Sequence, residues 1–200
     1  MFHGDVVNTQ RFAQQRLLSR RRDGRNARNP LGKRVFMDTR DPRGAVLETH
    51  LPDAAATRSL GAALARAAVP GMILLLRGTL GAGKTTLVQG FAAELGASPA
   101  ASPSFVLAHR YAGGRLPLWH LDLYRIEDPE DVEDLDLEQY LPHDGVAVIE
   151  WPERAPGGFG VDHVDVDLSV EGDGRHARVR GFGRFATLAL DRTSFDSAAR

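Results

Sequence analysis

The sequence contains no cysteine, and only two of its 200 residues are lysine. Without cysteine there are no disulfides, thiolate zinc sites or cysteine nucleophiles, which is typical of a reducing cytosol. No apolar run approaches the roughly 18 residues that a membrane span requires, and the N-terminal residues lack the apolar core of a signal peptide. We therefore expect a cytoplasmic protein with no membrane contact.

Charge divides the chain into two parts. Residues 1–44 carry 11 lysines and arginines against 4 acidic residues, whereas residues 45–200 carry 14 against 22. The first part has only scattered apolar residues, which bury too little surface to offset the entropy lost on ordering. We predict a disordered basic tail over 1–44, a folded domain over 45–185 and a polar C-terminal end over 186–200.

The basic tail has three competing interpretations. It is an arm that contacts nucleic-acid phosphates, a solvated linker, or a stretch upstream of the true translation start. We favour the third, because Met37 lies shortly before the first patterned segment. The nucleic-acid arm is the least favoured of the three.

Strand-like and helix-like segments follow one another along the folded part. A strand is expected at 45–51, a helix begins at Pro52, and a continuous apolar run at 72–77 is typical of a buried strand. A second helix starts at Lys84, with Gly96 as its expected C-cap. The remaining segments predict two strands turning at Gly113 and Gly114, an acidic helix over 127–138, a buried strand at 145–151 and a hairpin turning at 171–174.

A glycine-rich motif joins the apolar strand to the second helix. Gly78, Gly83, Lys84 and Thr85 match GxxxxGK[ST], and the strand–loop–helix context predicts a P-loop rather than a simple glycine turn. Lys84 supports this, because the flat fork of arginine does not replace a compact ammonium between phosphates. The expected nucleotide contacts are Gly78, Leu80, Gly81, Ala82, Gly83, Lys84, Thr85 and Thr86.

These elements together predict an α/β domain. We expect a P-loop NTPase-like, three-layer α/β/α fold with a mixed central sheet and a C-terminal β-hairpin.

A P-loop also requires hard oxygen ligands for Mg²⁺. Thr85 offers a hydroxyl, and Asp122 and Glu150 each close an apolar strand, although either acid is also compatible with an ordinary strand end. An alternating strand places His120 on the same face as Asp122, as packing or as a hydrogen-bonded neighbour. Trp151, directly after Glu150, is either a core aromatic or a base-stacking platform.

The absence of one motif predicts which nucleotide base is bound. Guanine-specific P-loop proteins use an NKxD-type loop, and asparagine occurs here only at positions 8, 26 and 29, all in the tail. ATP is therefore the expected nucleotide. No arginine is marked by spacing as an arginine finger, although Arg110 and Arg125 are candidates.

At this point the residues resemble one family, TsaE, the small P-loop ATPases of bacterial tRNA threonylcarbamoyladenosine synthesis. The resemblance runs in order over about 46–183 through GTLGAGKTTLVQG, ASPSF, LWHLDLYRIEDPEDVEDLDLEQYL and VAVIEWPE. It implies that Lys84 holds the phosphates, that Thr85 and Glu150 hold Mg²⁺, and that Asp122 positions or activates the attacking water.

The resemblance also places two further residues near the nucleotide. Trp151 matches a tryptophan close to the nucleotide site, and Ser104 lies in a switch-like loop, SPSF, that faces the γ-phosphate. Two positions depart from the family pattern. Ser104 stands where threonine is usual, which retains the hydroxyl, and Thr79 stands where many members have aspartate.

The function that the resemblance implies is slow, Mg²⁺-dependent ATP hydrolysis by a subunit that acts with the TsaB and TsaD proteins. The modified base would be position 37 of ANN-decoding tRNAs, with tRNA reached only through the complex. Two alternatives remain: a small-molecule P-loop kinase, for which no lid-length segment is evident between Gly96 and Gly145, and a nucleotide-binding module without turnover.

Overall fold

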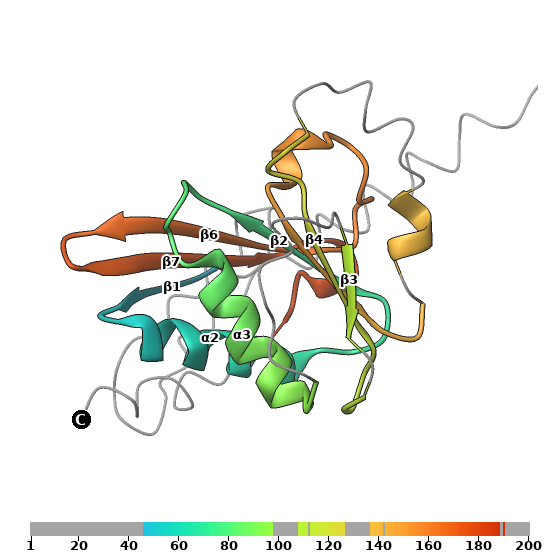
Figure 1. Cartoon of the computed structure of the whole chain (residues 1–200), viewed down its shortest axis with the longest axis horizontal. Helices are drawn as coiled ribbons and strands as arrows, with labels where there is room; N and C mark the ends of the chain where they lie inside the picture. Colours follow the sequence, from blue (N-terminus) through green and yellow to red (C-terminus); the bar gives the residue numbers. More distant parts are fainter. Residues whose placement is uncertain are drawn as a thin grey trace, which may run out of the picture. The chain divides into compact units, whose positions relative to one another are not determined.

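The computed structural model describes residues 46–97, 108–111, 113–126, 137–141, 143–188 and 190. Among these residues, seven strands form one sheet in the order β1-β7-β6-β2-β5-β4-β3 (Figure 1). The strands are β1 (Val46–Leu51), β2 (Met72–Arg77), β3 (Ala108–Tyr111), β4 (Leu118–Asp122), β5 (Val146–Glu150), β6 (Val164–Glu171) and β7 (Gly174–Gly181).

The sheet is mixed, as the sequence predicted. β2 pairs in parallel with both β5 and β6, and β4 pairs in parallel with β5. The outer pairs β1–β7, β6–β7 and β3–β4 are antiparallel, so the expected C-terminal hairpin is present as β6 and β7. Because parallel strands end at the same edge, the residues that follow β2, β4 and β5 gather there.

Within the described ranges, two α-helices cover one face of the sheet. α2 (Ala54–Ala67) begins after Asp53, whose carboxylate accepts a 2.7 Å hydrogen bond from the amide of Ala56. α3 (Lys84–Leu95) ends at Gly96 in the left-handed conformation, which confirms the predicted C-cap. Figure 1 shows the two helices side by side. In the described part of the chain, no helix combines the length and apolar character needed to cross a membrane.

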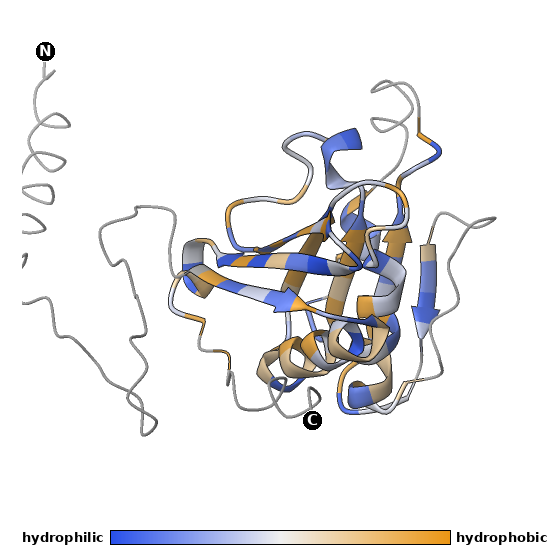
Figure 2. Ribbon diagram, turned by 90° about the vertical axis from the view of Figure 1, so that its left-hand side faces the viewer, coloured by the Kyte–Doolittle hydropathy of each residue, from blue (hydrophilic) through white to orange (hydrophobic). Residues whose placement is uncertain are grey.

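The larger hydrophobic core lies between the sheet and these helices. β2 is apolar at consecutive positions because side chains on both of its faces are covered, which explains why its sequence does not alternate. Figure 2 shows the central strands as mostly hydrophobic, whereas colours alternate along the β6–β7 hairpin. The fully buried large side chains of this core include Leu60, Leu64, Leu74, Leu76, Leu87, Phe91 and Leu118.

The opposite face of the central strands is covered, within the described residues, by short turns rather than α-helices. The one-turn 3-10 helix η1 (Leu137–Tyr140) contributes to a second core with Leu75, Leu121 and Ile149. Trp151 and Ala155, on either side of the 3-10 helix η2 (Pro152–Arg154), also pack in this core. Of the predicted acidic helix, residues 127–136 lie outside the described residues, and the remainder belongs to η1. A third 3-10 helix, η3 (Gly183–Phe185), follows the hairpin.

The contact between the two helices makes a stability prediction. A Cβ added at Gly61 of α2 would collide with the backbone carbonyl oxygen of Leu87 in α3. Intrinsic helix propensity alone favours alanine over glycine by about 1 kcal/mol. We expect Gly61→Ala nevertheless to lower the free energy of unfolding by about 1–3 kcal/mol, because the helices must separate. Urea denaturation measures this difference.

A matched substitution isolates the packing effect. Arg58→Ala, at an exposed position of the same helix, should change the free energy of unfolding by less than about 0.5 kcal/mol. A more stable Gly61→Ala protein would contradict the close helix contact.

Candidate active site

The glycine loop lies between the end of β2 and the start of α3. Gly78, Gly81 and Gly83 have φ angles of 135°, 77° and 104°, a region that side-chain-bearing residues rarely adopt. A Cβ on Gly78 would also collide with the carbonyl oxygen of Leu168 in β6. Gly83 is the N-cap of α3 and no side chain caps that end. The first amides of the helix are therefore left to bind an anion.

Lys84 is buried inside this loop, with 5% of its surface exposed. Its Nζ donates hydrogen bonds to the carbonyl oxygens of Gly78 at 2.7 Å and Thr79 at 3.0 Å. The same ammonium lies 3.9 Å from the ring centroid of Trp151. Burial lowers the pKa of Lys84 below 10.5, against the opposing attraction of nearby carboxylates, first among them Glu150. The lysine is thus held at the loop rather than extended into solvent.

The lowered pKa of Lys84 is directly measurable, because the chain has only one other lysine, Lys33 in the tail. Burial disfavours the charged form, so the ammonium should lose its proton at a lower pH than an ordinary lysine. In protein labelled with ¹³C-lysine, we expect the Lys84 Cε signal to titrate with a midpoint below that of Lys33. Lys33→Arg assigns the two signals. Coincident titration near pH 10.5 would contradict the lowered pKa and show that burial does not outweigh the attraction of the nearby carboxylates.

Glu150 contacts both Thr85, the other predicted Mg²⁺ ligand, and His120. Its side chain is buried at the end of β5, with the residue 3% exposed. Its Oε1 accepts a 3.1 Å hydrogen bond from the Thr85 hydroxyl and lies 3.0 Å from His120 Nε2. Because a carboxylate only accepts, we assign the ring proton of His120 to Nε2. Its Nδ1 is buried without a hydrogen-bond partner in the described residues, which agrees with that assignment.

This network brings together Thr85 and Glu150, which the sequence placed together at the metal. It also makes His120, which is fully buried, a hydrogen-bonded neighbour of the site rather than mere packing. The sequence left those two interpretations open.

Asp122 ends β4 directly beside the end of β5. The strand register pairs its backbone with Glu150, and its Oδ1 accepts a 3.1 Å hydrogen bond from the amide of Tyr124. Burial raises the pKa of Asp122 above its ordinary value, opposed first by the Tyr124 hydrogen bond. A raised pKa makes this carboxylate a better proton acceptor near neutral pH.

Trp151 forms an aromatic wall next to the lysine. It has a φ of 59°, and among the described residues it is the only non-glycine with a positive φ. Its amide donates to the carbonyl of Leu76 in β2 at 3.2 Å, and its ring centroid lies 5.0 Å from that of Tyr124. Such a costly backbone conformation is commonly found at functional sites. Tyr124 is a neighbour that sequence reasoning did not single out.

The oxygen atoms at the site suit a nucleotide-bound Mg²⁺. The described residues contain no cluster of three or more histidine, cysteine or acidic side chains arranged to hold a metal ion. They do offer the hydroxyl of Thr85 beside the carboxylate of Glu150. Mg²⁺ typically takes one or two protein ligands and completes its shell with phosphate oxygens and water. The residues therefore fit a metal that arrives with a phosphate ligand.

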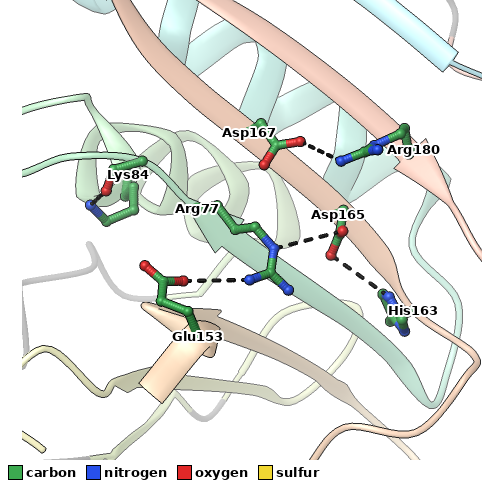
Figure 3. A network of polar contacts seen from close by, with 8 residues as sticks. Arg77, Lys84, Glu153, His163, Asp165, Asp167 and Arg180 are labelled. Atoms are coloured by element: carbon green, nitrogen blue, oxygen red, sulfur yellow. Dashed lines mark hydrogen bonds and ion pairs between the residues drawn. The ribbon is translucent and has the colours of Figure 1, made fainter. Parts of the chain in front are cut away.

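Ion pairs on the face of the sheet opposite α2 and α3 connect β2, which leads into the loop, to the elements beside it. Arg77, the last residue of β2, lies 3.5 Å from Glu153 of η2 and 3.7 Å from Asp165 of β6 (Figure 3). Asp167 of β6 in turn pairs with Arg180 of β7 at 2.8 Å. The contacts link η2, β2, β6 and β7, so the strand that leads into the loop is tied to its neighbours.

Two further residues were named from the sequence, Ser104 and the candidate arginine finger Arg110. Ser104, with the SPSF segment, lies outside the described residues. The guanidinium carbon of Arg110 lies 5.8 Å from the ring centroid of Trp119. In the part of the chain that the structure describes, Arg175 of β7 does contact the loop, and its Nη2 donates to the carbonyl of Gly81 at 3.4 Å. Sequence reasoning missed it, because only the pairing of a distant hairpin brings it there.

The comparisons with known proteins agree with this geometry. The family model described as "Threonylcarbamoyl adenosine biosynthesis protein TsaE" matches residues 51–179. The tRNA threonylcarbamoyladenosine biosynthesis protein TsaE of Nostoc sp. is 47% identical over 113 residues, which are 53% of this chain and 68% of that protein. The protein of the same name from Bacillus subtilis is 45% identical over 118 residues, covering 58% of this chain and 73% of that one.

A third relative and a solved structure extend the match. The TsaE protein of Streptomyces coelicolor is 41% identical over 141 residues, which are 65% of this chain and 94% of that protein. The crystal structure of Bacillus subtilis YdiB superposes with a TM-score of 0.63 at 26% identity, covering 78% of this chain and 96% of that one. The predicted P-loop NTPase-like α/β fold is thereby confirmed.

Proposed function

The chain belongs to the TsaE family, which takes part in the biosynthesis of threonylcarbamoyladenosine in tRNA, and from this premise we propose that it binds Mg·ATP and hydrolyses it slowly. The observation that carries the proposal is the arrangement at the carboxyl edge of the sheet. There, Lys84 is buried in the glycine loop, and the Thr85 hydroxyl meets the Glu150 carboxylate. We further propose that the TsaB and TsaD proteins are its partners and that it meets tRNA only through them.

The chemistry follows from the positions of these side chains. When bound with ATP through Thr85 and Glu150, Mg²⁺ neutralises negative charge on the phosphates. Lys84 exchanges its carbonyl partners for phosphate oxygens and stabilises the charge that develops on the transferred group. Asp122 orients the attacking water and accepts its proton, a role that its raised pKa supports.

Slow turnover is expected from what surrounds the site. Arg110 lies against Trp119, and an arginine finger accelerates P-loop hydrolysis by about 10³–10⁵ where one is supplied. With Arg110 engaged there, we propose that the protein acting alone hydrolyses ATP slowly. This rate suits a subunit that uses ATP to change the state of a complex.

The proposal is tested by phosphate release from Mg·ATP, with the full-length protein alone and with TsaB and TsaD from the same organism. We expect slow release that increases with the two proteins and is lost in Lys84→Met. Phosphate release that does not change when TsaB and TsaD are added would contradict their proposed role as partners. Transfer of the phosphoryl group to an added small molecule in place of water would favour the kinase alternative.

A further inference from the structure

The β6–β7 hairpin extends past the glycine loop on one side. β2 ends at Arg77 opposite Asp167, whereas β6 continues to Glu171, four residues or about 13 Å further. Gly78 packs directly against the backbone of Leu168, so the hairpin is in contact with the loop where it begins. Figure 1 shows the hairpin projecting beyond the central strands. Its tip therefore forms a wall beside the loop.

The tip presents an apolar and a cationic side chain next to each other. Val170 and Arg175 are directly opposite in the hairpin register. Side chains alternate along a strand, and Leu168 and Val166, two and four residues before Val170, are buried against the helices. Val170 and Arg175 therefore face the side of α3 and the glycine loop. Val170 is 55% exposed, which leaves its methyl groups uncovered.

Arg175 is fixed in position by carbonyl groups instead of acids. It donates to the carbonyl oxygens of Gly81 at 3.4 Å, Gly174 at 2.9 Å and Asp173 at 3.4 Å. Within the described residues no carboxylate lies at ion-pair distance from it, whereas Arg178 and Arg180 of the same strand pair with acids. Its charge is thus not neutralised by an acid, and its guanidinium plane is held beside the loop.

The order of the strands indicates what this wall would contact. Glu150 and Asp122 come from β5 and β4, on one side of β2, and the hairpin lies on the other. If the terminal phosphate lies near the two acids, the opposite end of the triphosphate, which carries the nucleoside, points toward the hairpin. An apolar side chain with an adjacent guanidinium suits the face of a planar heteroaromatic base.

We propose that Val170 and Arg175, at the tip of the β6–β7 hairpin, form the binding site of the nucleoside. In this site, Arg175 stacks on the base while it contacts the loop. This inference rests on the proposed nucleotide binding and assigns residues to the part of the ligand that the glycine loop does not hold. It gives Arg175 a role in binding, distinct from that of an arginine finger on the terminal phosphate.

Calorimetric binding of Mg·ADP and of Mg²⁺ with inorganic tripolyphosphate to the full-length protein separates the two parts of the ligand. We expect Arg175→Ala to weaken ADP binding about 3- to 30-fold, the range of a cation–π contact, and to change tripolyphosphate binding less than about twofold. Val170→Ser, at an exposed position, should weaken ADP binding in the same direction by a smaller factor. Arg178→Ala, which faces the other side of the sheet, should change neither.

The outcomes distinguish a failure of the proposed nucleoside site from a failure of the proposed function. Equal weakening of both ligands by Arg175→Ala would make Arg175 a phosphate ligand and overturn the inference, as would unchanged binding of both ligands in Arg175→Ala and Val170→Ser. Lys84→Met should weaken both ligands strongly. If Lys84→Met binds both as tightly as the wild type, the proposed nucleotide site itself fails. Circular dichroism of each variant shows that the fold is retained.

Discussion

Replacing Lys84 with methionine is expected to reduce ATP hydrolysis by at least about 10²–10³-fold, the loss typical when one preorganised charge-stabilising donor is removed. Methionine has a similar length and suits a buried position, but it has no ammonium to exchange from the carbonyls of Gly78 and Thr79 to phosphate oxygens. Phosphate release at saturating Mg·ATP measures the loss in rate, and calorimetry measures the accompanying loss in affinity.

Two further variants sharpen the Lys84 prediction. Lys84→Arg keeps the charge but replaces a compact ammonium with a wide planar fork, and the enclosed position of Lys84 should leave it nearly as inactive as methionine. Lys33→Met, which removes the chain's other lysine from the basic tail, should have no effect on the rate. An active Lys84→Met protein would show that the glycine loop is a structural turn.

Asp122→Asn is expected to lower the hydrolysis rate by about 10²–10⁴-fold, the usual contribution of a positioned acid or base. Asparagine retains the shape of the aspartate side chain and the oxygen that accepts a hydrogen bond from the amide of Tyr124. It does not, however, accept a proton from water. ATP affinity should be unchanged or slightly higher, because a negative charge near the phosphates has been removed. Single-turnover phosphate release and equilibrium binding separate the two effects.

The control for Asp122 is Asp144→Asn, which changes an exposed acid just before β5, at the other edge of the sheet. It should hydrolyse ATP at the wild-type rate. If Asp122→Asn also retains that rate, Asp122 is an ordinary strand-end acid, and the positioning of water must fall to another group such as Glu150.

The parts of the fold and site that follow local rules were predictable from the sequence. The glycine loop combines a strand, a motif of fixed spacing and a helix within some 25 residues, so the position of Lys84 required no long-range information. Asp122 and Glu150 were identified because each closes an apolar run, and parallel strands bring such ends to one edge. Gly96 and the Gly113–Gly114 turn follow from the tolerance of glycine for positive φ.

The parts that depend on strand register were not predictable. The hydrogen bond of His120 to Glu150 requires β4 to lie beside β5 with one particular alignment, and no spacing along the chain sets that alignment. Arg175 reaches Gly81 from 94 residues away because a hairpin packs against the loop. The left-handed backbone of Trp151 is likewise imposed by tertiary contacts, since nothing in tryptophan itself favours a positive φ.

We propose that tRNA modification requires from this protein the nucleotide site built around Lys84. The most direct measurement is the threonylcarbamoyladenosine content of tRNA, by mass spectrometry, in bacteria depleted of their own TsaE and supplied with this protein or its Lys84→Met variant. We expect the wild type to restore the modified nucleoside and the variant, made at equal levels, not to restore it. Restoration by both would contradict it, because the chain would then act in the pathway without its ATP site.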